Sequence, residues 1–200
     1  MKQLSPAQDP LILERYAVGT LDRKVQNKVA LQQAWGWPKE PRRPMLCLPE
    51  GMTDALGGKV LEELMAGILS LDVSLVILGK GSTEYGSYFT KLAKAEPHRV
   101  RIMKNEEAAL HQLLAASDMA LVLTDSQEET LAHCLAFGTV PIAVEHPMLE
   151  DYNPVQETGN AFTCDESTLW KVYAALVRAC ETYKFPFDWR TIQRHGMETK

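Results

Sequence analysis

The chain has 200 residues, 46% of them hydrophobic and 24% charged, which is ordinary for a globular protein and excludes a disordered chain, a collagen repeat and a coiled-coil rod. This length predicts one domain over residues 1–200 that buries its core without metal or disulfide staples. The formal net charge of −5 argues against a nucleic-acid partner, because binding phosphates needs clustered Lys and Arg.

The four cysteines form no Cys-x-x-Cys pair, and no His lies at metal-ligand spacing from any of them. We therefore expect free thiols in a reducing cytoplasm and no metal site. The first ten residues lack the apolar core of a signal peptide, and no segment has eighteen uninterrupted apolar residues, so no membrane partner is expected.

Helix-like and strand-like patterns alternate along most of the chain. An apolar stripe through Leu21, Val25 and Val29 predicts a first helix that ends at Gly36. Short apolar runs bounded by turn residues predict strands at 44–48, 73–78, 99–103, 119–123, 140–144 and 160–163. Helices are expected between them, followed by two near the C-terminus. Because strands that are apolar at every residue must be covered on both faces, the pattern predicts a doubly wound parallel sheet, a Rossmann-like α/β fold.

In such a sheet, ligands bind outside the carboxyl ends of the strands, next to the N-termini of the following helices. That rule selects loops 49–58, 79–82, 104–106 and 124–129. The first carries Gly57-Gly58-Lys59, which suits a phosphate approaching the backbone, and the second carries Gly79-Lys80-Gly81, which suits a nucleotide. Neither is a complete nucleotide-binding motif, and the first also fits a flexible helix entry.

Polar residues in the other two loops have a purely structural interpretation. Ser126 and Glu129 fit a capping box, and Asn105 fits an N-cap followed by two acidic residues. The five His residues accompany no nucleophile motif, so we expect them on the surface or in helix packing. The four Trp residues have side chains suited to sugar stacking, but we expect most of them to pack.

A set of short motifs follows one order through nearly the whole chain. They are Ser5-Pro6-Ala7-Gln8-Asp9-Pro10-Leu11-Ile12, Arg15-Tyr16, Lys24-x-x-Asn27-Lys28-x-Ala30-Leu31-Gln32, Gly36-x-Pro38, Leu78-Gly79-x-Gly81, Glu107-Ala108, Leu110-His111, Ala116-Ser117-Asp118, Phe137-Gly138-Thr139-Val140-Pro141-Ile142, Thr158-Gly159-Asn160-Ala161-Phe162, Trp189 and Gln193-Arg194-x-Gly196-Met197. Together they resemble the C-terminal lobe of bacterial glycogen synthases and plant starch synthases.

The resemblance implies a retaining glycosyltransferase of the GT-B type, in which two Rossmann-like lobes enclose a cleft. It implies glucose transfer from ADP-glucose to an α-1,4-glucan without a metal or other cofactor, in the cytoplasm or, in a plant or alga, the plastid stroma. This chain would be the second lobe alone, with residues 1–20 as an interlobe linker. The candidate ligand-binding residues are Gly57, Gly58, Lys59, Gly79, Lys80, Gly81, Asn105, Asp125 and Glu128.

The chain departs from the family pattern where the family binds the diphosphate. Pro49-Glu50-Gly51 and a stretch ending in Ala55-Leu56 replace the segments that carry the family's Arg and Lys. An acid about 4 Å from a phosphate replaces attraction by repulsion of roughly 4 kcal/mol at an effective dielectric near 20, unless Lys59 or Lys80 compensates.

Three further departures affect the same pocket. The family's Glu-Pro-Cys-Gly-Leu loop becomes 124–130, where Asp125 or Glu128 would stand in for its glutamate. Asn105 replaces a tyrosine beside the adenine pocket, and His146-Pro147-Met148-Leu149 replaces a Gly-Gly-Leu segment. These changes predict a fold that is kept while catalysis is lost.

Two hypotheses remain open. In the first, a separate polypeptide or an omitted segment supplies the acceptor lobe, and Lys59, Lys80, Gly79, Gly81 and Asp125 form a rearranged donor site for ADP-glucose or ADP. In the second, the chain is a non-catalytic module that binds an α-glucan, a nucleotide or a synthase partner. Either way we expect association with another lobe or a second copy, through an apolar patch that carries Tyr16, Trp35 or Trp37.

Overall fold

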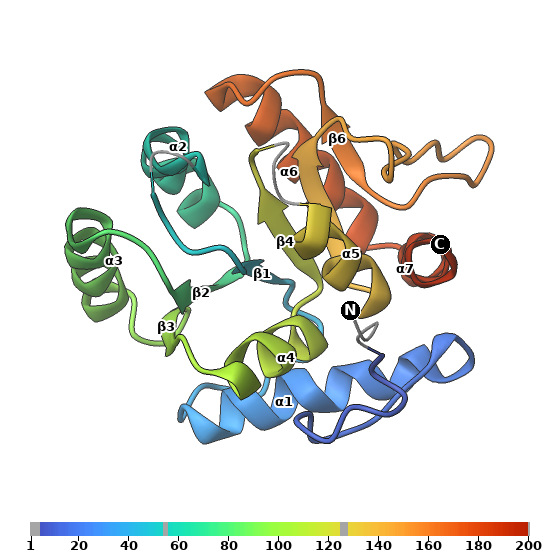
Figure 1. The fold of residues 1–200 in the computed structure, drawn as a ribbon, viewed down its shortest axis with the longest axis horizontal. Coiled ribbons are helices and arrows are strands. Elements are labelled where there is room, and N and C mark those ends of the chain that lie inside the picture. Colours follow the sequence, from blue (N-terminus) through green and yellow to red (C-terminus); the bar gives the residue numbers. More distant parts are fainter. Residues whose placement is uncertain (1–4, 54–55, 125–127, 200) are drawn as a thin grey trace.

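The computed structural model describes residues 5–53, 56–124 and 128–199. Within these residues the chain forms one parallel sheet of six strands (Figure 1). The strands are β1 (Met45–Leu48), β2 (Ser74–Gly79), β3 (Val100–Lys104), β4 (Met119–Val122), β5 (Val140–Val144) and β6 (Phe162–Cys164). They lie in the order β3-β2-β1-β4-β5-β6, which confirms the predicted doubly wound, Rossmann-like sheet.

Helices precede, connect and follow the strands. They are the 3-10 helix η1 (Val18–Arg23) and the α-helices α1 (Lys24–Ala34), α2 (Gly58–Ser70), α3 (Thr83–Ala95), α4 (Glu107–Ala116), α5 (Glu128–Ala136), α6 (Leu169–Tyr183) and α7 (Pro186–Glu198). None of the helices described is long and apolar enough to cross a membrane. All four cysteines are free thiols, as expected.

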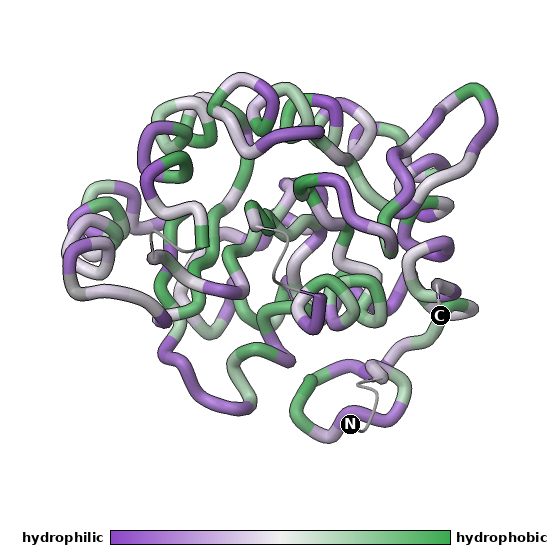
Figure 2. Tube along the Cα trace, turned by 45° about the horizontal axis from the view of Figure 1, so that its top comes forward, coloured by the Kyte–Doolittle hydropathy of each residue, from purple (hydrophilic) through white to green (hydrophobic). Residues whose placement is uncertain are grey.

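Neighbouring residues of each strand face opposite sides of the sheet. Leu46 and Leu48 of β1 belong to the hydrophobic cluster under α2, α3 and α6, while Met45 and Cys47 belong to the cluster under α4 and α5. Figure 2 shows the strands as largely apolar segments in the middle of the molecule. Because both faces are covered, the strands have no wet side, which explains their continuous apolar runs.

Helix α1 turns a different face to the core from the predicted one. Val25 and Val29 of the expected stripe are only half buried, whereas Lys24, Asn27 and Lys28 are buried. Buried polar groups are tolerated when they are hydrogen-bonded. Lys28 Nζ donates to the carbonyls of two residues in the loop before β1, and Lys24 Nζ to two carbonyls at the end of α4. The apolar spacing therefore identified the helix but not its buried face.

Two other expectations fail. Tyr16 and Trp37 do not lie on an exposed apolar patch, because they are only 2% and 5% exposed, and Trp35 is half buried against Trp37. Asn105 is not the N-cap of α4. The cap is Glu106, and its side chain makes no capping hydrogen bond.

Candidate functional site

The strand order reverses between β1 and β4, and this switch point positions the candidate site. From β1 the chain continues outward to β2 and β3, whereas β4 leads to β5 and β6 on the other side. In open α/β sheets, the crevice for a ligand lies at the carboxyl ends of the two strands on either side of such a point. Here the loops after β1 and β4 border it, and the loop after β2 lies beside them.

Glu50 links the ends of three strands in this crevice. It follows β1, and its Oε2 lies 2.7 Å from the Nζ of Lys80, which follows β2. Its Oε1 accepts a hydrogen bond from the hydroxyl of Thr130 on α5, the helix after β4. The Glu50 side chain is 20% exposed and the Lys80 side chain 47%. The ammonium of Lys80 therefore has an anionic partner within the chain itself.

Backbone contacts hold Glu50 and Lys80 in register. The Met52 N–H donates to the Lys80 carbonyl at 3.0 Å, and the Ser82 N–H donates to the Met52 carbonyl at 3.1 Å. A Cβ at Gly51 would lie 1.8 Å from the Lys80 carbonyl oxygen, and one at Gly81 would lie 2.1 Å from that of Met52. Gly81 also has a φ of +136°, which disfavours any side chain. Glycine is thus required in the Gly-Lys-Gly segment for the two loops to meet.

The glycine pair before α2 has a comparable packing role. Gly57 caps the helix with a φ of +85°, and a Cβ there would lie 2.8 Å from Cβ of Leu123, directly after β4. The Gly58 N–H donates to the Thr53 carbonyl at 2.7 Å, so this amide already has an acceptor. Lys59 is exposed and forms no ion pair within the described ranges. The contact of Gly57 with Leu123 places the N-terminus of α2 at the switch point, in one of the loops that the strand ends selected.

The remaining candidate residues are spread along the same edge. Asn105 follows β3 and is exposed, whereas Glu128 begins α5 after β4. Three strand spacings separate β3 from β4, or roughly 14 Å, so these two residues border opposite parts of the edge. Asp125 and Ser126, the residue expected to cap this helix, lie outside the described residues.

Sequence reasoning missed two side chains near Glu50. Thr130 was not singled out, because a threonine in the first turns of a helix gives no signal for a partner eighty positions away. His133, one turn further along α5, is half buried, and burial lowers its pKa, while the charges of Glu129 and Glu50 act in the opposite direction. Glu50 thus accepts a hydrogen bond from Thr130, and its charge opposes the lowering of the pKa of His133.

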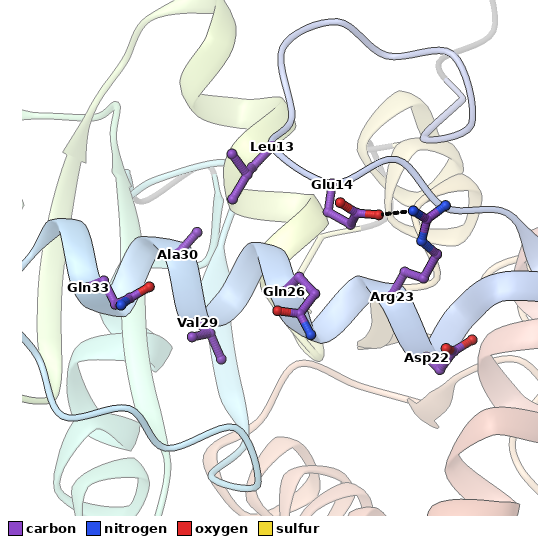
Figure 3. A pocket seen from close by; sticks show the side chains of 8 residues that line it. All are labelled: Leu13, Glu14, Asp22, Arg23, Gln26, Val29, Ala30 and Gln33. Atoms are coloured by element: carbon purple, nitrogen blue, oxygen red, sulfur yellow. Dashed lines mark ion pairs between the residues drawn. The ribbon is translucent and has the colours of Figure 1, made fainter.

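Two cavities lie away from this crevice. One of about 420 Å³ lies between Leu13 and the outer side of α1, beside the ion pair of Glu14 with Arg23 (Figure 3). Another of about 920 Å³ lies at the amino ends of the strands, where Pro44, Val73 and Asp118 line it. In the part of the chain that the structure describes, no group of three or more His, Cys, Asp or Glu side chains could hold a metal ion.

The curated proteins that are similar to this chain in sequence include bacterial glycogen synthases. No protein-family model matches the chain. A glycogen synthase of Thermosipho melanesiensis is 31% identical over 205 residues, 98% of this chain and 43% of that protein. One of Geobacillus stearothermophilus is 28% identical over 200 residues, 96% of this chain and 41% of that protein. The chain thus spans about two fifths of the length of the curated relatives it matches.

Solved structures agree on the fold. The catalytic domain of starch synthase IV from Arabidopsis thaliana, bound to ADP and acarbose, superposes with a TM-score of 0.84 at 22% identity over 98% of this chain and 43% of that one. The C-terminal domain of a group 1 glycosyl transferase from Francisella tularensis superposes with a TM-score of 0.64 at 12% identity, over 87% of this chain and 91% of that one. These matches confirm the expected GT-B lobe fold.

Proposed function

We propose that this chain is a glycogen synthase-like glycosyltransferase domain that acts as a non-catalytic binding lobe and does not by itself transfer glucose from ADP-glucose. The observation that carries the proposal is the contact of Glu50 with Lys80 at the switch point. Catalysis of glycosyl transfer depends on preorganised donors that stabilise the departing diphosphate. In this crevice the positive charge of Lys80 already has an anion at 2.7 Å.

The surrounding charge supports the same proposal. Exposed carboxylates of Glu106, Glu107, Glu128 and Glu129 begin the helices after β3 and β4. Helix N-termini attract anions, but acidic side chains in the first turn already use that attraction. A diphosphate in the crevice would therefore meet acids at two helix starts and would have to separate Lys80 from Glu50.

The experiment that tests the proposal measures transfer and binding together. The protein is incubated with ADP-glucose and glycogen, and chain elongation is compared with a blank without protein. Calorimetric titration with ADP and with ADP-glucose follows. We expect no elongation above the blank and no binding of either nucleotide in the micromolar range. Elongation above the blank would refute the non-catalytic role, and the first hypothesis of a rearranged donor site would replace it.

A second candidate function, binding of an α-glucan, is favoured by the exposure of Trp170. Its side chain is 76% exposed at the start of α6, just after β6 ends at Cys164. This places an aromatic face on the same edge of the sheet as the crevice. Exposed tryptophan offers a large, flat surface that suits stacking against a sugar ring.

A further inference from the structure

We propose that Glu50 is the specificity-determining residue of the switch-point crevice, acting as a built-in anion that occupies the binding position of a ligand phosphate. The inference rests on the proposed function, because it explains how that crevice excludes a nucleoside diphosphate. Beyond the proposed function, it assigns the exclusion of diphosphates to the Glu50 side chain alone. Replacing that side chain should therefore allow a diphosphate to bind.

The two oxygens of Glu50 are bound as those of an anionic ligand would be. Oε2 meets the ammonium of Lys80 at 2.7 Å, and Oε1 accepts from the hydroxyl of Thr130. These partners come from two different elements on either side of β1, which are the loop after β2 and the helix after β4. Phosphate oxygens accept from the same donor types, an ammonium and a hydroxyl.

The backbone that carries the two donors is held in place independently of Glu50. The carbonyl of Lys80 accepts from the Met52 N–H, and its own N–H donates to the Leu78 carbonyl at 2.7 Å. Thr130 lies on α5 with only 8% of its surface exposed. The backbone that carries both donors therefore keeps its place when Glu50 loses its charge, and the ammonium of Lys80 is left without its carboxylate partner.

The replacement Glu50→Gln tests this with little change of shape. The amide oxygen of the new side chain still accepts from Thr130, but the ion pair with Lys80 is lost. The ammonium of Lys80 then lacks a negatively charged partner, and the phosphate group of an added ligand takes that place. A charge-assisted hydrogen bond of this kind is strong enough to change affinity by about tenfold or more.

The experiment titrates ADP, and separately inorganic pyrophosphate, into the wild-type protein, Glu50→Gln, Glu129→Gln and the double variant Glu50→Gln with Lys80→Met. Glu129→Gln is the matched control, since it removes one exposed negative charge next to Thr130 without touching Lys80. We expect Glu50→Gln to bind both probes at least about tenfold more tightly than the wild type, with a change below about threefold for the control. The double variant should return to the wild-type affinity.

Equal gains in Glu50→Gln and Glu129→Gln would overturn the inference, because net charge alone would then explain them. A gain that survives Lys80→Met would overturn it as well. Glu50→Ala provides a second variant with the same expected gain, and thermal unfolding of each variant verifies that it is folded. If the wild type elongates glycogen, the proposed function fails. If it does not, and Glu50→Gln binds no more tightly, only the present inference fails.

Discussion

The ammonium of Lys28 lies 2.6 Å from Oδ2 of Asp118, and the two side chains are only 1% and 11% exposed. This ion pair ties α1 to the residue before β4, and the same carboxylate oxygen accepts the N–H of Met45 at the start of β1. Lys28 also donates to the hydroxyl of Tyr183 on α6. The pair thus stabilises the amino edge of the sheet, opposite the edge that carries the candidate site.

Replacing Lys28 by Met should destabilise the fold strongly. The change leaves Asp118 charged and buried without its counter-ion, and removing one partner of a buried pair costs about 3–5 kcal/mol. Urea unfolding measures this loss, with Lys39→Met, an exposed position, as the control expected to change stability by less than about 0.5 kcal/mol. A loss below about 1 kcal/mol for Lys28→Met would contradict the structural role of the pair.

Lys24 predicts a pH dependence of stability. It is buried, with no carboxylate in direct contact among the residues that the structure describes, and burial lowers its pKa from 10.5 to about 7. Between these two values the unfolded chain holds a proton that the folded chain has released, so stability rises with pH by about 1.4 kcal/mol per unit from this group. Below pH 7 both states are protonated and this slope vanishes.

The measurement compares the free energy of unfolding of the wild type and Lys24→Met from pH 6 to pH 9. The difference between the two proteins should stay constant from pH 6 to about pH 7 and then grow in favour of the wild type. Parallel curves over the whole range would show that Lys24 does not titrate in this window.

Two glycines five positions apart should respond in opposite directions to alanine. Gly81→Ala places a Cβ 2.1 Å from the Met52 carbonyl oxygen at a positive φ, so we expect a loss of about 1–3 kcal/mol. Gly86→Ala lies on the exposed side of α3 with nothing within 4 Å of the new Cβ, so we expect a gain of up to about 1 kcal/mol. Thermal unfolding measures both, and equal effects would refute the assigned packing of the two loops.

Replacing Trp170 by Ala tests the glucan candidate. Loss of one stacking face should weaken the binding of a maltooligosaccharide by about two- to tenfold in calorimetric titration. Phe187→Ala is the control, because this side chain is 70% exposed but lies at the start of α7, beyond the far end of α6. Equal losses in both variants, or no binding by the wild type, would remove α-glucan as a ligand of this surface.

Much of the fold could be predicted from local pattern. Every predicted strand is present within two residues of its expected limits, because strands covered on both faces must be apolar throughout. The face of α1 could not be predicted in this way. Its buried side chains are polar. The acceptors of Lys28 include the Pro41 carbonyl, 13 positions away, and the hydroxyl of Tyr183, 155 positions away.

The candidate site was only partly predictable. The strand ends selected loops that the structure places around the switch point, and the departure at Glu50 was evident from the family resemblance. That Lys80 would contact Glu50, rather than remain free for a ligand, depends on the pairing of Met52 with Gly81 across two loops. Thr130 could not be assigned to the site from the sequence, because only the folded position of α5 brings it to Glu50. Association with another lobe or a second copy stays a prediction. The exposed apolar patch of Tyr16, Trp35 or Trp37 that was expected to mediate it is not present, because Tyr16 and Trp37 are buried.

The most direct measurement of the central claim is a crystal structure of the protein grown with an excess of ADP-glucose. The account predicts that Glu50 keeps both of its contacts, to Lys80 and to Thr130, and that no diphosphate lies at the switch point. A diphosphate seated against Lys80, with Glu50 turned away from it, would contradict the account.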